Sequence, residues 1–188
     1  IILKKFIESG FIKFVFCLNY KADIIVDHFS DGSKYGVSIE YTYEKKRMGT
    51  AGALLLAKDK VSEDFLVING DVLTNFNFNN LVKFQKDSNS DCVLCTKNHD
   101  VTVPYGVVQS QGTDFIGVQE KPVYSYNISA GVYIMNRKIL KYIPPDCFYD
   151  MPMLIESIKN KHKVSTFPIS EYWADIGTMK DLFSVRNT

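Results

Sequence analysis

Phe65-Leu66-Val67-Ile68 is an apolar run, and Asn69-Gly70-Asp71 follows it directly. The run predicts a buried strand, and a carboxylate at its carboxyl end lies where open α/β sheets bind ligands. Gly70 lets the backbone approach a ligand closely, and Asp71 offers a hard oxygen ligand suited to Mg²⁺. The simpler interpretation is an ordinary turn, because Asn, Gly and Asp are typical turn residues.

A second carboxylate has a similar setting far away in the sequence. It is Asp175, within Trp173-Ala174-Asp175-Ile176-Gly177-Thr178. Two aspartates at strand ends can hold one metal ion between them. We therefore expect Asp71 and Asp175 at adjacent strand ends, with their carboxylates close enough to share Mg²⁺.

The segments around this strand alternate between strand and helix patterns. We expect helices over 2–9, 24–29, 49–58 and 78–86, and strands over 12–18, 37–41, 65–68 and 91–96. This order is typical of a βαβ-wound, largely parallel sheet. The second half predicts a hairpin over 105–120, strands over 129–135 and 164–169, and helices over 153–159 and 179–185. We interpret the hairpin as an insertion that covers the sheet, and residues 1–188 as a single domain.

Composition excludes several classes of function. The chain has 188 residues and a formal net charge of +1, and it has no long basic run, so we expect no nucleic-acid partner. No apolar stretch is long enough to cross a bilayer, which predicts a soluble, cytoplasmic protein without a membrane partner. Cys92 and Cys95 lie three apart in a predicted strand, where they point to opposite faces, so we expect free thiols and no metal site.

Two further motifs suit a phosphorylated ligand. Gly49-Thr50-Ala51-Gly52 places small residues at a helix start, where free N–H groups favour anions and a flat base can lie against the backbone. Close helix–strand packing explains the same residues equally well. Glu120-Lys121-Pro122 ends a strand, where Lys121 can meet a phosphate and Glu120 can accept from sugar hydroxyls. An exposed ion pair is the simpler interpretation.

Glycines indicate two more positions where a ligand or another segment of the chain can closely approach the backbone. Gly106 follows Pro104-Tyr105. Its backbone can contact a ligand, and a turn at the start of a strand explains the glycine equally well. Asn127-Ile128-Ser129-Ala130-Gly131-Val132-Tyr133 places an amide and small residues in a strand, which indicates a close approach at Gly131.

Taken in order, these motifs closely resemble the sugar-1-phosphate nucleotidyltransferases, in particular the branch similar to mannose-1-phosphate guanylyltransferases. The resemblance covers nearly the whole chain. It implies a three-layer α/β/α Rossmann-like fold with a mixed, mainly parallel sheet. It also implies transfer of a nucleoside monophosphate, GMP from GTP in this branch, to a sugar 1-phosphate with release of pyrophosphate. The family allows a homo-oligomer and regulatory CBS domains upstream in the full-length protein.

The resemblance also assigns roles to individual residues. Asp71 and Asp175 would bind Mg²⁺ and, with Lys121, would serve catalysis. Gly49, Thr50, Gly52 and Gly70 would border the nucleotide. The residues around the sugar and its phosphate would be Gly106, Glu120, Lys121, Asn127 and Gly131. In-line attack on the α-phosphorus needs positioning and charge neutralisation, which two carboxylates, a metal ion and a lysine supply.

The chain departs from the family pattern in one respect. The family carries a glycine-rich loop with an arginine, and then a Pro-Lys pair, upstream of the helix over 2–9. Residues 1–188 contain no such loop, so we expect a domain that lacks its N-terminal signature loop and first strand, with a vacant central position in the sheet and no activity by itself. The alternative to an enzyme is a non-catalytic sensor that binds a nucleotide or a sugar nucleotide.

Overall fold

The computed structural model of the chain describes residues 2–177. Its strands are β1 (Lys13–Leu18), β2 (Ser38–Tyr43), β3 (Asp64–Ile68), β4 (Val72–Thr74), β5 (Cys92–Thr102), β6 (Val107–Gln111), β7 (Asp114–Gln119), β8 (Val123–Asn136), β9 (Val164–Pro168) and β10 (Trp173–Asp175). Its α-helices are α1 (Ile2–Glu8), α2 (Ala22–Phe29), α3 (Gly49–Gly52), α4 (Phe78–Ser88) and α5 (Met151–Ile158). Its 3₁₀ helices are η1 (Ser33–Tyr35), η2 (Ala53–Ala57) and η3 (Arg137–Tyr142). The helix predicted over 179–185 lies outside the described residues.

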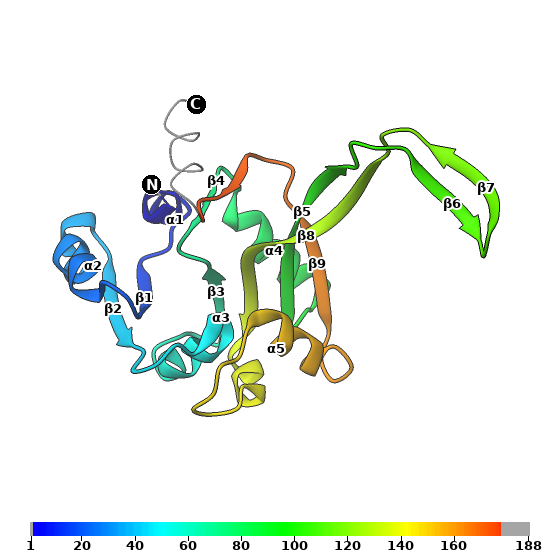
Figure 1. Cartoon of the computed structure of the whole chain (residues 1–188). Helices are drawn as coiled ribbons and strands as arrows, with labels where there is room; N and C mark the ends of the chain where they lie inside the picture. The colour runs from blue at the N-terminus through cyan, green and yellow to red at the C-terminus, as the bar shows by residue number, and fades with distance from the viewer. Residues whose placement is uncertain (1, 178–188) are drawn as a thin grey trace.

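A four-stranded sheet with the order β3-β8-β5-β9 forms the centre of the molecule (Figure 1). β8 is antiparallel to β3 and to β5, and β9 is parallel to β5. β3, β5 and β9 therefore run in one direction and β8 runs against them. This arrangement confirms the predicted mixed sheet, whose strands run mainly in parallel.

Helices cover both faces of this sheet. On one face, Phe6 of α1 stacks on Phe78 of α4 with the ring centroids 4.0 Å apart, in a cluster that includes Val132 of β8. On the other face, Leu154 of α5 belongs to a cluster that includes Tyr133 of β8. Neighbouring residues of β8 thus point to opposite faces, as the pleat requires. The result is the predicted α/β/α layering.

The cysteines are free, as predicted. Cys92 packs in the cluster with α5, and Cys95 packs in the cluster with α4, so the two thiols point to opposite faces of the sheet. Burial raises the pKa of each thiol to about 12. Both therefore remain protonated at neutral pH and act as small apolar side chains.

β1, α2 and β2 form a parallel βαβ unit beside the central sheet. Within residues 2–177, β1 pairs with β2 alone and β3 pairs with β8 alone. The β1–β2 pair forms a sheet of its own, and Figure 1 draws it apart from β3. One edge of β1 and one edge of β3 therefore have no strand partner in the described part of the chain.

The hairpin of β6 and β7 extends from the outer halves of β5 and β8 as a projecting arm (Figure 1). The expectation that this hairpin covers the sheet is wrong. β5 and β8 remain paired out to Thr102 and Val123, well beyond the part of the sheet that β9 and β3 flank. This two-stranded ribbon carries the hairpin away from the layers.

A hydrogen-bonded cluster joins three elements at the end of β5 where the strand begins. The Asp91 carboxylate lies 2.5 Å from Lys138 Nζ of η3 and 2.8 Å from His162 Nδ1, in the loop after α5. His162 Nε2 lies 3.0 Å from the Tyr142 hydroxyl. Burial opposes ionisation of Asp91, but the hydrogen bonds from Lys138 and His162 outweigh it and lower the pKa of this carboxyl.

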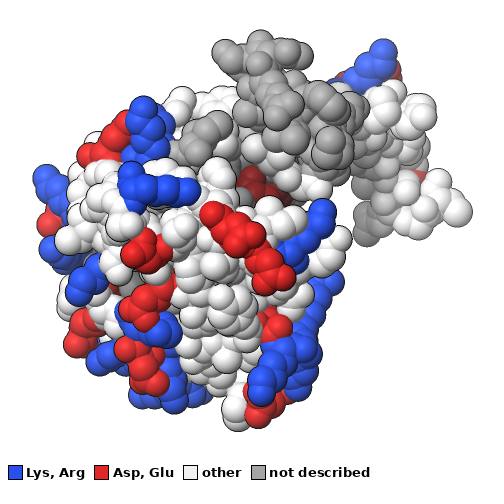
Figure 2. Space-filling view, turned by 90° about the vertical axis from the view of Figure 1, so that its left-hand side faces the viewer, with Lys and Arg blue, Asp and Glu red and all other residues white. Residues whose placement is uncertain are grey.

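The face formed by the β1–α2–β2 side carries acidic and basic side chains in close alternation (Figure 2). This face therefore has no extended patch of positive or negative electrostatic potential. None of the helices within residues 2–177 has the length and apolar character needed to cross a membrane.

Candidate active site at the turn after β3

Asp71 lies in a tight turn that links β3 to β4. The Val72 N–H donates to the Asn69 carbonyl oxygen at 3.2 Å, which closes a four-residue turn with Gly70 and Asp71 at its corner. Both corner residues are exposed. The ordinary-turn interpretation is therefore correct for the backbone, and the turn also presents the Asp71 carboxylate to solvent.

Gly131 of β8 packs directly against this turn. The Asn69 N–H donates to the Gly131 carbonyl oxygen at 2.9 Å. A Cβ atom on Gly131 would come within 2.9 Å of the Asn69 side-chain nitrogen and within 3.0 Å of Val72. Gly131 also has a φ of +66°, a conformation that favours glycine. The close approach predicted at Gly131 is therefore made by Asn69 of the same chain.

The segment around Asp175 reaches the same place through β10. β10 is antiparallel to β4, with Asp175 opposite Val72, and the Ile176 N–H donates to the Asp71 carbonyl oxygen at 2.8 Å. The Trp173 indole N–H donates to the Ala130 carbonyl oxygen at 2.8 Å, which ties β10 to β8. Three motifs that lie far apart in the sequence therefore meet at the turn after β3.

Asp71 and Asp175 lie on neighbouring segments, and both are exposed. Asp71 belongs to a turn, so the strict alternation of a strand does not fix the direction of its side chain. Among the described residues, no group of three or more His, Cys, Asp or Glu side chains is placed to hold a metal ion. Two carboxylates with room for substrate oxygens nevertheless suit Mg²⁺, which is often bound by one or two carboxylates plus phosphates.

The nucleotide-binding candidates Gly49, Thr50 and Gly52 lie elsewhere. In Figure 1, α3 is at the opposite end of β3 from β4. The Asp150 Oδ1 atom accepts hydrogen bonds from the Thr50 N–H at 2.9 Å and from the Thr50 hydroxyl at 3.2 Å. A Cβ atom on Gly49 would come within 2.7 Å of the Tyr149 carbonyl oxygen. In this structure the small residues of α3 allow close packing against the 147–150 loop.

The sugar-phosphate candidates are divided between two places. Gly131 is at the turn after β3, whereas Asn127 lies further along β8, opposite Asn98, on the exposed ribbon. The other three are at the base of the hairpin arm. There the Lys121 N–H donates to the Tyr105 carbonyl oxygen at 3.2 Å, and a Cβ atom on Gly106 would come within 3.1 Å of the Glu120 carboxylate.

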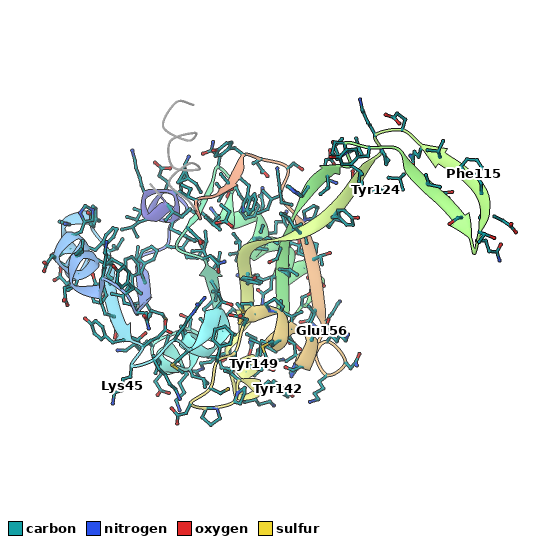
Figure 3. All side chains as sticks on the ribbon, in the orientation of Figure 1. Lys45, Phe115, Tyr124, Tyr142, Tyr149 and Glu156 are labelled. Atoms are coloured by element: carbon teal, nitrogen blue, oxygen red, sulfur yellow. The ribbon has the colours of Figure 1, made fainter. Side chains whose placement is uncertain are left out.

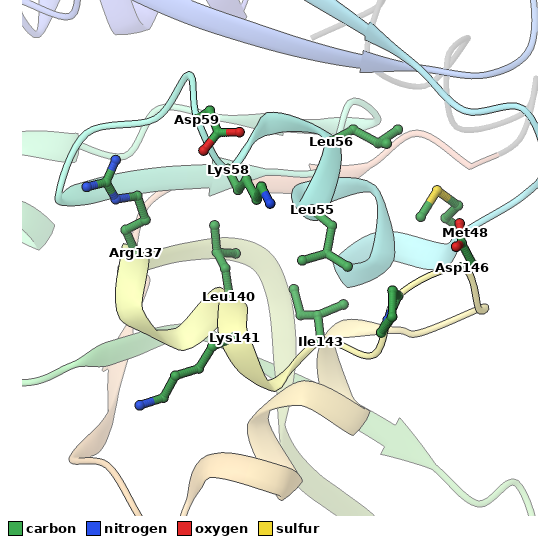
Figure 4. Close-up of a pocket in the computed structure, with 11 residues that line it drawn as sticks. Met48, Leu55, Leu56, Lys58, Asp59, Arg137, Leu140, Lys141, Ile143 and Asp146 are labelled. Atoms are coloured by element: carbon green, nitrogen blue, oxygen red, sulfur yellow. The ribbon is translucent and has the colours of Figure 1, made fainter.

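The structure also has a hollow that contains none of the predicted site residues. It has a volume of about 670 Å³ and lies between η2 and the η3 segment. In the close-up of Figure 4, Leu55, Leu140 and Ile143 point toward one another, and Arg137 lies near one end. The motifs around Asp71, Gly131 and Asp175 meet at the turn after β3 and not at this hollow.

Sequence reasoning assigned no structural role to two residues that organise these sites. Trp173 holds β10 against β8 through its indole N–H, and its signal was its place as the single tryptophan, two residues before Asp175. Asp150 caps Thr50 from 100 positions away in the sequence. No local pattern connects residues so far apart.

Comparisons with a family model and with curated proteins both identify nucleotidyltransferases. The model of the family described as "Nucleotidyl transferase" matches residues 1–188. The chain is 30% identical over 184 residues to a mannose-1-phosphate guanyltransferase of Yarrowia lipolytica, covering 94% of this chain and 51% of that protein. It is also 30% identical over 182 residues to the enzyme of the same name from Schizosaccharomyces pombe, covering 92% of this chain and 50% of that protein. The chain thus spans about half the length of the curated relatives it matches.

A solved structure shares the fold. The crystal structure of HddC from Yersinia pseudotuberculosis superposes with a TM-score of 0.73 at 24% sequence identity, covering 97% of this chain and 80% of that chain. A second crystal structure of HddC, complexed with GMP-PN, gives a TM-score of 0.71 at 22% identity, covering the same shares of the two chains. The arrangement of sheet and helices described above is therefore a known fold.

Proposed function

Because the chain belongs to the nucleotidyl transferase family, we propose that the full-length protein joins a nucleoside triphosphate to a sugar 1-phosphate. An oxygen of the sugar phosphate attacks the α-phosphorus, a new P–O bond forms, and the bond to the β-phosphate breaks. The products are a nucleoside diphosphate sugar and pyrophosphate. The observation that carries this proposal is the meeting of the Asp71 turn, Gly131 and the Trp173–Asp175 strand at one place.

The proposed nucleotide is GTP and the proposed sugar is mannose 1-phosphate. The relatives from Yarrowia lipolytica and Schizosaccharomyces pombe are named mannose-1-phosphate guanyltransferases, and HddC was crystallised with GMP-PN. Glucosamine 1-phosphate and glucose 1-phosphate remain alternative acceptors. A cytoplasmic location fits the four free thiols, which are typical of reducing compartments.

Asp71 and Asp175 would hold Mg²⁺, which supplies charge neutralisation to the phosphates when bound. Gly70 at the corner of the turn leaves room for a ligand beside the backbone, since a Cβ atom there would meet nothing within 4 Å. Lys121 would contact the sugar phosphate, with Gly106, Glu120 and Asn127 around the sugar. Gly49, Thr50 and Gly52 would border the base. In this structure the arm and α3 lie away from the turn after β3, so these assignments are supported by the family resemblance alone.

The test measures pyrophosphate release by the full-length protein with each triphosphate and each sugar 1-phosphate. We expect Asp71→Asn and Asp175→Asn each to lower kcat by roughly 10²–10³-fold, because each keeps the shape of the side chain and removes a charge that the cation requires. Asp87→Asn, on the exposed end of α4, is the matched control and should keep full activity. Near-normal rates of both variants at saturating magnesium would refute the two-carboxylate site.

Lys121 is tested separately through the acceptor. Lys121→Ala should raise KM for the sugar 1-phosphate with a smaller effect on kcat, because it removes a single cation contact. Lys121→Arg should restore part of the loss, since lysine acts here as a point charge. Residues 1–188 contain no glycine-rich arginine loop, so we expect them to be inactive by themselves. Binding of GTP by the full-length protein without turnover would support the sensor instead.

A further inference from the structure

The chain between β9 and β10 is a short link that leads to Asp175. β9 belongs to the four-stranded sheet, and β10 belongs to a separate two-stranded sheet with β4. The link is formed by residues 169–172, which belong to no helix or strand. Figure 1 shows it in orange, crossing from β9 to the strand beside β4. Because the link lies between the two sheets, its path depends on contacts from its surroundings.

Side chains from both sheets bond to three consecutive carbonyl oxygens of the link. The Lys97 ammonium of β5 donates to the Ser170 carbonyl oxygen at 3.2 Å and to the Glu171 carbonyl oxygen at 2.8 Å. The next carbonyl oxygen, that of Tyr172, accepts from the Thr74 hydroxyl of β4 at 2.8 Å. A lysine ammonium has three donors, so one side chain can bridge two carbonyls. Lys97 and Thr74 therefore hold the link from the two sheets that it connects.

Lys97 lies where the ribbon of β5 and β8 leaves the layers. β9 pairs with β5 only as far as Thr96, so Lys97 is the first residue of β5 beyond the end of β9. Tyr124 of β8, opposite Val101, lies further out along the ribbon toward the arm (Figure 3). This position at the base of the ribbon allows the Lys97 side chain to reach across the end of β9 to the link.

The charge of Lys97 is directed at the link alone. Lys97 is half-buried and forms no ion pair with a carboxylate of residues 2–177. A hydrogen bond from a charged donor is stronger than one between neutral groups. Its two bonds to backbone carbonyls are therefore the interactions through which Lys97 can act.

We infer that Lys97 is a positioning residue for Asp175. β10 has three residues and pairs only with β4 within residues 2–177, and a two-stranded pair is marginal by itself. Its place at the turn after β3 therefore depends on contacts outside the strand pair. The Trp173 indole anchors β10 itself, and Lys97 anchors the link before it. The role of this anchor in the reaction rests on the proposed function, in which Asp175 binds Mg²⁺.

Hydrogen exchange of the Ile176 amide, in the full-length protein without metal or nucleotide, tests the anchor directly. The Ile176 N–H donates to the Asp71 carbonyl oxygen, so its protection reports whether the segment after β10 stays on the turn. Lys97→Met keeps an unbranched side chain and removes the donors. We expect this variant to exchange roughly 3–10-fold faster at Ile176. The Asn136 amide, at the far end of β8, should keep its rate, which also shows that the body remains folded.

Pyrophosphate release at varied magnesium tests the role of the anchor in the reaction. Lys97→Met should raise the magnesium concentration for half-maximal rate roughly 3–10-fold and leave KM for the sugar 1-phosphate unchanged. A general loss of stability would instead reduce the amount of active enzyme without moving either constant. Lys97→Arg keeps donors for both carbonyls and should restore most of the exchange protection and of the magnesium dependence. Lys86→Met removes the same charge from an exposed position of α4 and should match the wild type.

Two results would overturn the inference. The first is unchanged exchange at Ile176 in Lys97→Met. The second is faster exchange with an unchanged magnesium requirement, since the anchor would then serve the fold alone. Failure of the proposed function would be recognised separately, because near-normal rates of Asp175→Asn would refute the metal site and remove the role of Lys97 in the reaction.

Discussion

Gly131 is the residue that most constrains the candidate site. Its left-handed backbone disfavours any side chain by about 1–2 kcal/mol, and a Cβ atom would also press on Asn69. We expect Gly131→Ala to lower the free energy of unfolding by roughly 2–4 kcal/mol, measured by urea denaturation. Gly112→Ala is the matched control, because Gly112 has a φ of +60° and open space around it.

The control should lose only the backbone contribution, about 1 kcal/mol. Equal losses for the two variants would mean that the Asn69 side chain moves aside freely and that the turn is not held in place by Gly131. The sequence predicted a close approach at this glycine but not its partner. A glycine in a strand indicates that another group packs closely against its backbone, but it does not identify that group.

Elements with their own apolar run or cap could be predicted from the sequence. α4 is an example, with Asn77 accepting from the Asn79 N–H at 3.0 Å at its start and a left-handed Asn89 at its end. The sequence predicted Asp175 at a strand end beside Asp71, but the extents and the register of β4 and β10 could not be predicted, because each strand has three residues and its partner lies about a hundred positions away. The outer halves of β5 and β8 were also missed, since their exposed residues lack a continuous apolar run.

The Asp91 cluster joins β5, η3 and the loop before β9. Its contribution to the free energy of unfolding should depend on pH. The pKa of Asp91 is lowered in the folded state, so this carboxyl stabilises the fold above its unfolded pKa of about 4. That stability is lost as pH falls from about 4 through the lower folded value. At pH 7 we expect Asp91→Asn to cost about 1–2 kcal/mol, or a few degrees in Tm.

Thermal unfolding at neutral and acidic pH checks this prediction. The deficit of Asp91→Asn relative to wild type should shrink as pH falls below about 4, because protons bind the carboxylate of the unfolded wild-type chain there before they bind the folded one. Asp87→Asn, at an exposed position of α4, should track the wild type throughout. A constant deficit at all pH values would indicate that the charge of Asp91 contributes nothing and that only its shape matters.

At the scale of the whole molecule, the free edges of β1 and β3 should be detectable by amide hydrogen exchange. The Ser38 N–H donates to the Ile12 carbonyl oxygen, so the even residues of β1 bond to β2 and the N–H of Val15 faces away. The Asn69 N–H donates to Gly131, so the odd residues of β3 bond to β8 and the N–H of Leu66 faces away. We expect Val15 and Leu66 to exchange faster than their neighbours Phe16 and Val67.

The neighbouring amides serve as internal controls for local exposure and sequence effects. Equal protection of all four in the chain of residues 1–188 would show that a further strand covers these edges. The α/β/α layering could be predicted from the motifs, as could the meeting of Asp71 with the Asp175 segment. The direction in which the arm projects could not be predicted, because local residue patterns do not encode the twist of a two-stranded ribbon.

The indole of Trp173 reaches back 43 positions to Ala130, and the Thr74 hydroxyl reaches forward 98 positions to Tyr172. A ribosome synthesises the chain in one direction, at about 5–20 residues per second. The turn after β3 therefore waits roughly 5–20 s for the strand that completes it. During translation, a nascent chain that ends before Asp175 therefore lacks the β10 strand that pairs with β4 and one of the two carboxylates proposed to bind Mg²⁺.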